Sequence, residues 1–214
     1  MRAANRQALK TDPEKMTKFP RTSRREERIQ SVLTRRQPNL TVVLENVHDP
    51  HNVGAVLRSC DAVGILRVHT IYSVEELPER AYARRTSGSA SKWIEVNHHR
   101  SVEDCYAALR AEGFTILVTA LTETGIDLYR ADFSQPVALV FGNEQRGASD
   151  AAVERADRAI EIPMMGMVES LNISVACAVS LFEAMRQRRE AGLYEAPQLD
   201  DAMITSLTAD WLER

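Results

Sequence analysis

Cysteine is scarce in this chain, and long apolar runs are missing. The three cysteines, Cys60, Cys105 and Cys177, are odd in number and far apart. This pattern disfavours a disulfide or metal framework and favours buried free thiols in a reducing compartment. No stretch approaches the ~18 unbroken apolar residues of a membrane span, and the N-terminus lacks the apolar core of a secretory signal. We therefore expect a cytoplasmic protein that is neither secreted nor membrane-embedded.

Several common catalytic signatures are also absent. The glycines form neither a G-x-G-x-x-G dinucleotide fingerprint nor a P-loop. No G-x-S-x-G elbow is present, and no Cys-His pairing is visible by spacing, so a covalent hydrolase is disfavoured. His48 and His51 share one segment without completing a zinc set, and the adjacent His98 and His99 would face opposite ways in a strand. No metal is expected.

Charge is distributed unevenly along the chain. The net charge is -3, but the chain has 11 Lys and Arg against 4 Asp and Glu up to Arg36, and 16 against 26 after it. A basic arm of this kind is suited to a polyanion, whose phosphates it would contact, although a solvated basic helix is the alternative. The candidate RNA contacts are Arg24, Arg25, Arg28, Arg35 and Arg36 in the arm, and Arg84 and Arg85 in an Arg- and Ser-rich loop at 84–92.

Short, continuous apolar segments alternate with helical patterns after the arm. This order predicts an α/β fold with a mainly parallel sheet flanked by helices. We expect strands at 40–44, 67–72, 93–96, 114–119, 137–141 and 159–162, and helices at 53–63, 102–112, 150–155, 172–189 and 200–212. A further helix begins near Ser23 and ends before Pro38. The predicted division is a basic N-terminal arm and helix (1–37), an α/β domain (38–190) and a C-terminal helical extension (191–214).

Ligands of an open parallel sheet bind beyond the carboxyl ends of its strands. The first segment of interest there is "ENVHDPHNVGAVLR". Asn52 is predicted to cap the following helix. Arg58 lies on the flank of the buried helical stripe, so it either reaches along the top of the sheet or pairs with Asp61.

The second segment is "FGNEQRGAS", which follows the apolar strand at 137–141. Gly142 and Gly147 allow close backbone approach and positive φ, and they present Asn143 and Glu144 between them. An ordinary turn would show the same glycines, so this segment alone does not establish a site.

The third segment, "EIPMMGMVESLNISVAC", places polar residues where a buried strand meets a buried helix. Buried polar groups cost about 1–3 kcal/mol each unless they find partners. A helix cap explains one of them, but Glu169, Ser170, Asn172 and Ser174 fall within six residues, and this excess favours a site. The methionines around Gly166, at 164, 165 and 167, are predicted to form an apolar wall for a flat ring or a thioether.

Taken together, "NVGAVLR", "VALVFGNEQRG" and "IEIPMMGMVESLNISVA" resemble, in this order, the three motifs of the SpoU branch of the SPOUT RNA 2'-O-ribose methyltransferases. The resemblance covers about residues 38–190. The basic helix and the C-terminal extension further resemble the TrmH type, which methylates the D-loop guanosine at position 18 of tRNA. The resemblance implies a C-terminal deep trefoil knot, S-adenosylmethionine as methyl donor, tRNA as substrate and a homodimer formed through the knot region. A ribosomal RNA substrate and a catalytically inactive RNA-binding paralogue are the alternatives.

The resemblance also implies individual site residues. Expected donor contacts are Thr119, Leu121, Gly142, Ile162, Met164 and Leu171, and the expected catalytic set is Arg58, Asn52, Glu144, Ser170 and Asn172. In the family the arginine that matches Arg58 is proposed as the base, but a guanidinium has a pKa above ~12 and is not expected to deprotonate. Stabilisation of the forming alkoxide by Arg58 is the alternative. Gln145 and Arg146 stand where many members have a smaller residue after the glutamate, and Ile173 replaces the usual valine.

Overall fold

The computed structural model describes residues 23–74 and 90–214. The predicted loose arm before Ser23 and the candidate contacts Arg84 and Arg85 lie outside these residues. The helices are α1 (Ser23–Leu33), α2 (Pro50–Val63), α3 (Val102–Ala111), α4 (Asp150–Arg155), α5 (Ile173–Glu190) and α6 (Asp201–Glu213), with short 3-10 helices η2 (Ala90–Lys92) and η3 (Leu128–Arg130). The strands are β1 (Leu40–Glu45), β2 (Arg67–Ile71), β3 (Glu95–His99), β4 (Thr115–Thr119), β5 (Ile126–Asp127), β6 (Val137–Phe141) and β7 (Arg158–Glu161).

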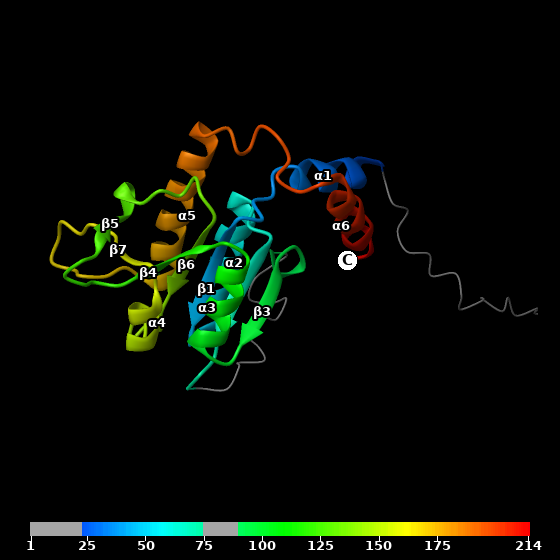
Figure 1. Ribbon diagram of the computed structural model, residues 1–214. Helices are drawn as coiled ribbons and strands as arrows, with labels where there is room; N and C mark the ends of the chain where they lie inside the picture. The colour runs from blue at the N-terminus through cyan, green and yellow to red at the C-terminus, as the bar shows by residue number, and fades with distance from the viewer. Residues whose placement is uncertain (1–22, 75–89) are drawn as a thin grey trace, which may run out of the picture.

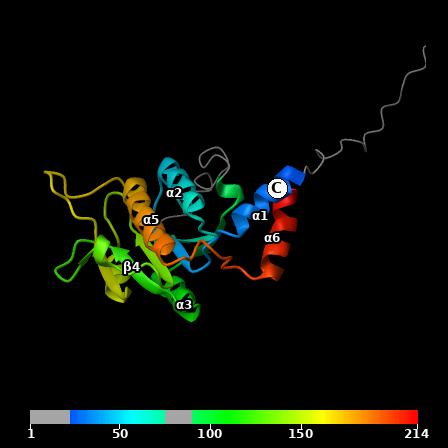
Figure 2. The ribbon, with the colours of Figure 1, turned by 90° about the horizontal axis from the view of Figure 1, so that it is seen from above.

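The described strands form one seven-stranded sheet in the order β3-β2-β1-β6-β4-β7-β5. Every neighbouring pair is parallel. Helices α2 and α5 pack together on one face, and α3 lies on the other (Figure 1, Figure 2). The predicted α/β class is therefore confirmed.

The central strands are covered on both faces, which explains their continuous apolar sequences. All residues of β1 and β6 are buried. Strands buried on both faces show no polar alternation. The chain leaves β1 towards the edge strand β3 and later returns to β4 and β6 on the other side, so the strand order reverses next to β1. At such a reversal the loops that follow the two neighbouring strands run in opposite directions, and they leave a crevice for a ligand at the carboxyl ends of the strands.

Two predicted element boundaries are wrong, each for an identifiable reason. Helix α2 begins at Pro50, and its N-cap is Asp49, whose carboxylate accepts a hydrogen bond from the His51 backbone N–H. Asn52 is therefore not the cap predicted for it. Strand β3 begins at Glu95, later than expected, because Trp93 packs against Trp211 of α6, with 5.0 Å between ring centroids.

The helices from the two ends of the chain pack against each other beside the sheet (Figure 1). Ile29 and Leu33 of α1 form an apolar cluster with Leu199 and Trp211. Ile29 and Leu33 are buried, so this face of α1 is apolar. The predicted N- and C-terminal extensions are thus in mutual contact.

The structure corrects the RNA contact that the sequence predicts for Arg36. Its side chain is fully buried and donates to Asp61 at 2.6 Å and to the Ile65 carbonyl at 2.7 Å. The guanidinium also lies over the Trp211 ring, 5.0 Å from its centroid. A side chain held this way has no surface to offer a phosphate, so the prediction for Arg36 is wrong. Its role is to join α1, α2 and α6.

A second buried arginine, Arg188, anchors the C-terminal part of α5. It donates to the Asn39 side chain at 2.5 Å and to backbone carbonyls of Asn39 and Gln135 at 2.9 and 2.8 Å. Burial lowers the pKa of Arg188 to about 10. Multiple oxygen acceptors compensate for its desolvation, as a buried charge requires.

The three cysteines are free and buried, as predicted. Burial raises the pKa of Cys60, which hydrogen-bonds to Cys177 between α2 and α5, and raises the pKa of Cys105 to about 12. Such thiols remain protonated at neutral pH and pack as small apolar groups. Within the described residues no helix is both long and apolar enough to cross a membrane.

Candidate active site

The loops after β4, β6 and β7 meet at the carboxyl edge of the sheet and enclose a cavity of about 840 Å³. All six predicted donor contacts line this larger cavity: Thr119, Leu121, Gly142, Ile162, Met164 and Leu171. Ligand pockets commonly have volumes of about 300–1,000 Å³. The second and third segments selected from the sequence are therefore adjacent in space, at the place expected for a ligand.

Gly142 is required by the close approach of its own loop. A Cβ at this position would lie 2.0 Å from the Ala148 nitrogen and 2.3 Å from the Gly147 carbonyl oxygen. Gly147 adopts the left-handed conformation with φ 71°. Both predicted features are confirmed: Gly142 allows the close backbone approach, and Gly147 has the positive φ.

The turn between these glycines is held by Asn143, whose contribution the sequence did not reveal. Backbone groups of Asn143 and Gly147 exchange two hydrogen bonds of 2.9 Å. The Asn143 side chain accepts from the Gln145 and Arg146 N–H groups at 2.9 and 3.2 Å, and donates to the Asn46 carbonyl at 2.7 Å. The turn that follows β6 is therefore fixed to β1, with Gln145 and Arg146 accommodated in it.

A chain of hydrogen bonds links three of the predicted catalytic residues. Asn172 donates to the Asn52 side-chain oxygen at 3.1 Å, and Asn52 donates to Glu144 at 3.1 Å. The three come from three segments that are 92 and 120 residues apart in sequence. Asn52 is buried, whereas Glu144 is exposed and lines the cavity.

Asn172 caps α5 and takes part in this chain at the same time. Its side-chain oxygen accepts from the Ser174 N–H at 2.9 Å and from the Ser174 hydroxyl at 2.6 Å, while its amide donates to Asn52. The capping and site interpretations are therefore compatible. The side-chain amide is oriented because its oxygen is already occupied by the cap.

A second, smaller cavity of about 540 Å³ lies on the other side of the same polar residues. Glu144 and Asn172 line both cavities, and Asn52 faces the smaller one. The two cavities also share Asn143, Gln145 and Arg146, and the smaller one is completed by His48 and Asp49. The geometry therefore provides a larger, mixed cavity and a smaller, polar one with a shared boundary.

The remaining residues of the third segment divide into two groups. Ser170 and Glu169 line the larger cavity with Met164. Met165 and Met167 are 93% and 100% exposed and line neither cavity. The prediction of a wall formed by three methionines is therefore wrong, because only Met164 lines the cavity.

Arg58 is not brought to the cavities within one chain. It lies on the exposed side of α2 and lines neither of them. The alternative pair with Asp61 does not form either, because Asp61 binds Arg36. Within the described part of the chain Arg58 makes no hydrogen bond or ion pair.

The basic residues of α1 that remain candidates are on the surface. Arg24, Arg25, Arg28 and Arg35 are exposed. Arg25 makes a long hydrogen bond of 3.4 Å to the Trp211 carbonyl, so α1 presents a basic face next to α6.

The smaller cavity contains residues that the sequence analysis did not assign. His48 packs edge-on against Tyr72, with 5.7 Å between ring centroids. The Tyr72 hydroxyl donates to the Val47 carbonyl at 2.7 Å, which fixes the backbone next to His48. Nothing in the local pattern "NVHDPHN" distinguishes these roles, because they depend on the contact between β2 and the loop after β1.

Known proteins that are similar to this chain include RNA methyltransferases. The chain is 48% identical, over 194 residues, to the tRNA (guanosine(18)-2'-O)-methyltransferase of Thermus thermophilus, covering 91% of this chain and 98% of that protein. The crystal structure of the Aquifex aeolicus TrmH/SpoU tRNA modifying enzyme superposes with a TM-score of 0.82 and 34% identity over 89% of this chain and 95% of that one. An AdoMet-bound rRNA methyltransferase from Sinorhizobium meliloti matches less fully, with a TM-score of 0.63 and 28% identity over 73% of this chain and 59% of that one.

The sequence profile of one family matches residues 39–182, which include β1, the three site segments and most of α5. This range agrees with the fold, since it contains all seven strands and both cavities. The chain belongs to the SpoU rRNA methylase family.

Proposed function

We propose that this protein transfers the methyl group of S-adenosylmethionine to the ribose 2'-oxygen of the guanosine at position 18 in the D-loop of tRNA. The observation that carries the proposal is the shared boundary of the two cavities, formed by Glu144 and Asn172. A donor in the larger cavity and a nucleoside in the smaller one would meet at these residues. Such proximity and orientation supply much of the catalysis of a transfer reaction.

The larger cavity suits the chemical parts of the donor. Leu121, Ile162, Met164 and Leu171 offer apolar surface for an adenine ring. Glu154, Glu161 and Glu169 also line the cavity and would attract a sulfonium and an ammonium. Bound there, the donor supplies an activated methyl group, and the rigid Gly142 turn fixes the surface against which it rests.

The smaller cavity suits a hydroxyl that must be held while its proton leaves. The linked side chains of Asn52 and Asn172 keep one oxygen of Glu144 occupied, which orients the other. A fixed carboxylate near a ribose can accept a hydrogen bond from its hydroxyl and align the oxygen for attack. We assign Glu144, Asn52, Asn172 and the adjacent Ser170 to positioning the acceptor.

We further propose that the protein is a homodimer and that Arg58 acts in the site of the partner subunit. The support is the exposed apolar stripe of α5, where Val175 is 46% and Phe182 49% exposed, with the half-buried Val179 between them. These residues recur at i, i+4 and i+7, as expected of a helix face that packs against another surface. Arg58, exposed on α2 next to α5, would then reach a second site and stabilise the alkoxide there.

A mixed-dimer experiment tests this arrangement. Arg58→Ala and Glu144→Ala subunits, each inactive alone, are coexpressed with different tags, and total methyl transfer is measured. If Arg58 acts across the dimer, half of the dimers are mixed and each has one complete site, so about one quarter of the wild-type activity returns. No recovery would place Arg58 in its own subunit's site, or outside the mechanism.

Transfer RNA is favoured over ribosomal RNA by the extent of the similarity. The match to the Thermus tRNA enzyme covers 98% of that protein, whereas the match to the rRNA methyltransferase structure covers 59% of that chain. Incubation with labelled donor, an unmodified tRNA transcript and ribosomal RNA, followed by mass mapping, separates the two. Label in rRNA alone would reject the tRNA assignment, and tight RNA binding without turnover would favour a non-catalytic paralogue.

The basic face of α1 is proposed to bind the tRNA body, in a protein that acts in the cytoplasm. Arg24 and Arg28 are exposed on α1, and Arg35 is exposed in the turn that follows it. Each phosphate contact steepens the salt dependence of affinity by about one in the logarithmic slope. A variant with all three changed to Gln should show a flatter slope, while an unchanged slope would refute the assignment. We also propose that the C-terminal part of the chain forms the deep trefoil knot that the family resemblance implies.

A further inference from the structure

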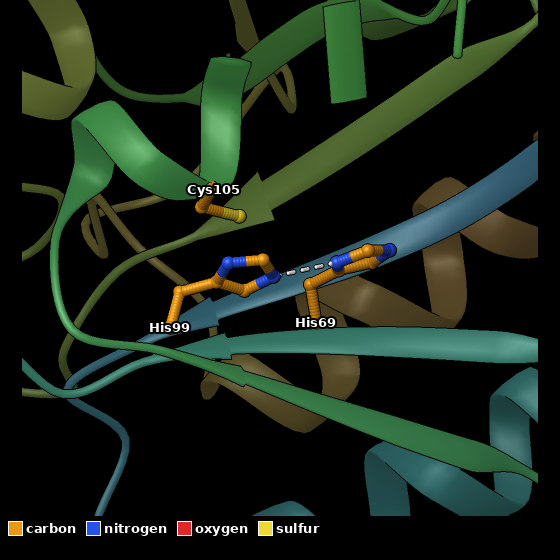
Figure 3. Close-up of side chains that lie close together, drawn as sticks. All are labelled: His69, His99 and Cys105. Carbon is orange, nitrogen blue, oxygen red and sulfur yellow. Dashed lines mark hydrogen bonds between the residues drawn. The ribbon is translucent and has the colours of Figure 1, made fainter. Parts of the chain in front are cut away.

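Two histidines and a cysteine converge on the face of the sheet that is covered by α3, away from the two cavities (Figure 3). His69 comes from β2, His99 ends β3, and Cys105 comes from α3. One ligand atom of each lies within 4.8 Å of those of the other two. The sequence analysis expected no metal because neither His48 and His51 nor His98 and His99 complete a zinc set, and it did not consider these three residues together.

The sheet register explains why the side chains meet. His99 pairs with Ile71, and Ile71 is two residues beyond His69 on the same strand. Residues i and i+2 of a strand face the same way, and paired residues on neighbouring strands do too. His69 and His99 therefore both point towards α3, whereas His98 points to the opposite face and contacts Thr70 at 2.7 Å.

The distances are those of a site that could close around a small ion. The His69 Nδ1 and His99 Nε2 atoms are 2.9 Å apart. Around a tetrahedral zinc ion, with bonds of about 2.0–2.1 Å to nitrogen and about 2.3 Å to sulfur, nitrogen ligands are about 3.3 Å apart and nitrogen and sulfur about 3.6 Å. Rotamer adjustments below about 1.5 Å would bring the three atoms to these separations.

The hydrogen bond between His69 Nδ1 and His99 Nε2 uses one nitrogen of each ring and leaves the second nitrogen of His69 unsatisfied within the described part of the chain. Cys105 is fully buried, His69 is 2% exposed, and Nε2 of His69 has no hydrogen-bond partner among the residues that the structure describes. That nitrogen is not the one that faces His99, so an ion in the cluster would bind His69 through Nδ1. His99, by contrast, is only partly buried at the edge strand, so the cluster has a route for an ion to enter.

We propose that His69, His99 and Cys105 form a binding site for one zinc ion or a similar borderline-soft divalent ion, with a water molecule as the fourth ligand. Two imidazoles and a thiolate are the donor types that such ions prefer. On binding, the Cys105 thiol loses its proton to the buffer as the sulfur–metal bond forms. The ion would join the edge strand β3 to β2 and α3, and so stabilise this side of the sheet.

Cobalt substitution tests the proposal on the full chain. The protein is freed of metal with a chelator, kept reduced with a phosphine, and titrated with Co²⁺. We expect a thiolate-to-Co²⁺ charge-transfer band that saturates at one ion per chain, releases one proton and disappears on adding Zn²⁺. At a hundredfold excess of free Zn²⁺ over its Kd, the unfolding midpoint should rise by about 5–11 °C.

Two variants and a matched control decide the assignment. Cys105→Ala should lose the charge-transfer band and the zinc-dependent rise in Tm, and His99→Asn, at the exposed strand edge, should weaken both if the other variant does not fold. Cys60→Ala, which removes a buried thiol elsewhere, should retain both. Circular dichroism of the metal-free proteins checks that each is folded. Absence of the band in the wild-type chain, or its persistence in His99→Asn and Cys105→Ala, would overturn the proposal.

Discussion

Gly142 offers the sharpest test of the donor cavity, because the effect of one added methyl group follows from the coordinates. In Gly142→Ala the new Cβ would lie 2.0 Å from the Ala148 nitrogen, 2.1 Å from the Gly147 carbonyl carbon and 2.3 Å from its oxygen. All three neighbours are backbone atoms in a hydrogen-bonded turn, so no flexible side chain can move aside. The turn must shift by about 1 Å or more to reach ordinary contact distances.

Overpacking of this kind costs about 1–3 kcal/mol in well-packed regions. For a chain of this size each kcal/mol lowers the unfolding midpoint by about 2–4 °C. We therefore expect Gly142→Ala to lower Tm by about 2–12 °C. Donor affinity should fall more than Tm alone suggests, because the displaced turn forms the surface of the larger cavity.

The assay combines isothermal titration with S-adenosylmethionine and a thermal melt, with Gly166→Ala as the matched control. Gly166 lies in the neighbouring loop, and a Cβ there would meet nothing within 4 Å. The control should keep both donor affinity and Tm. Equal donor affinity for wild type and Gly142→Ala would refute the reasoning, since it would show that the turn does not shape the donor site.

The other predictions concern the polar chain, the buried arginine and the proposed interface. Asn52→Ala should lower the rate of methyl transfer by about 100-fold while retaining donor binding, because Glu144 loses its orienting partner. An unchanged rate constant in a single-turnover assay would contradict this. Arg36→Met should lower the free energy of unfolding by about 2–3 kcal/mol in urea titrations, whereas the exposed Arg35→Met should change it by less than about 0.5 kcal/mol, and equal effects would count against a structural role for Arg36. Phe182→Asp should yield monomers in sedimentation velocity, and a persistent dimer would exclude this face of α5 as the interface.

The parallel sheet could be predicted from the sequence because its strands are buried on both faces. Segments such as "VALVF" contain no polar alternation, and the structure shows all five residues buried. The exception is β3, for which the sequence predicts "WIEV" (93–96) and the structure has Glu95–His99. Trp93 belongs to the apolar run because it packs on Trp211, 118 residues later, and not because it is part of the strand. No local pattern contains that contact.

Most of the residues predicted to line the larger cavity could be identified because Gly142, Ile162, Met164 and Leu171 lie in the second and third motifs, which the strand order brings together. Arg36 could not be recognised as buried, because its partners Asp61 and Trp211 come from distant parts of the chain. Its neighbours in sequence are basic, so composition suggested a surface role. The position of Arg58 could not be predicted because a residue on the flank of a helix can either reach the sheet edge or face solvent, and in the structure Arg58 is exposed.

The pairing of α1 with α6 has a consequence for biosynthesis. The apolar face of α1 is completed by Leu199 and Trp211, which are translated about 170 residues after it. An isolated helix of 11 residues is only marginally stable in water. The nascent chain therefore cannot stabilise its basic first helix until α6 has left the ribosome. A product that ends before α6 would lack a stably formed α1 even with the whole sheet in place.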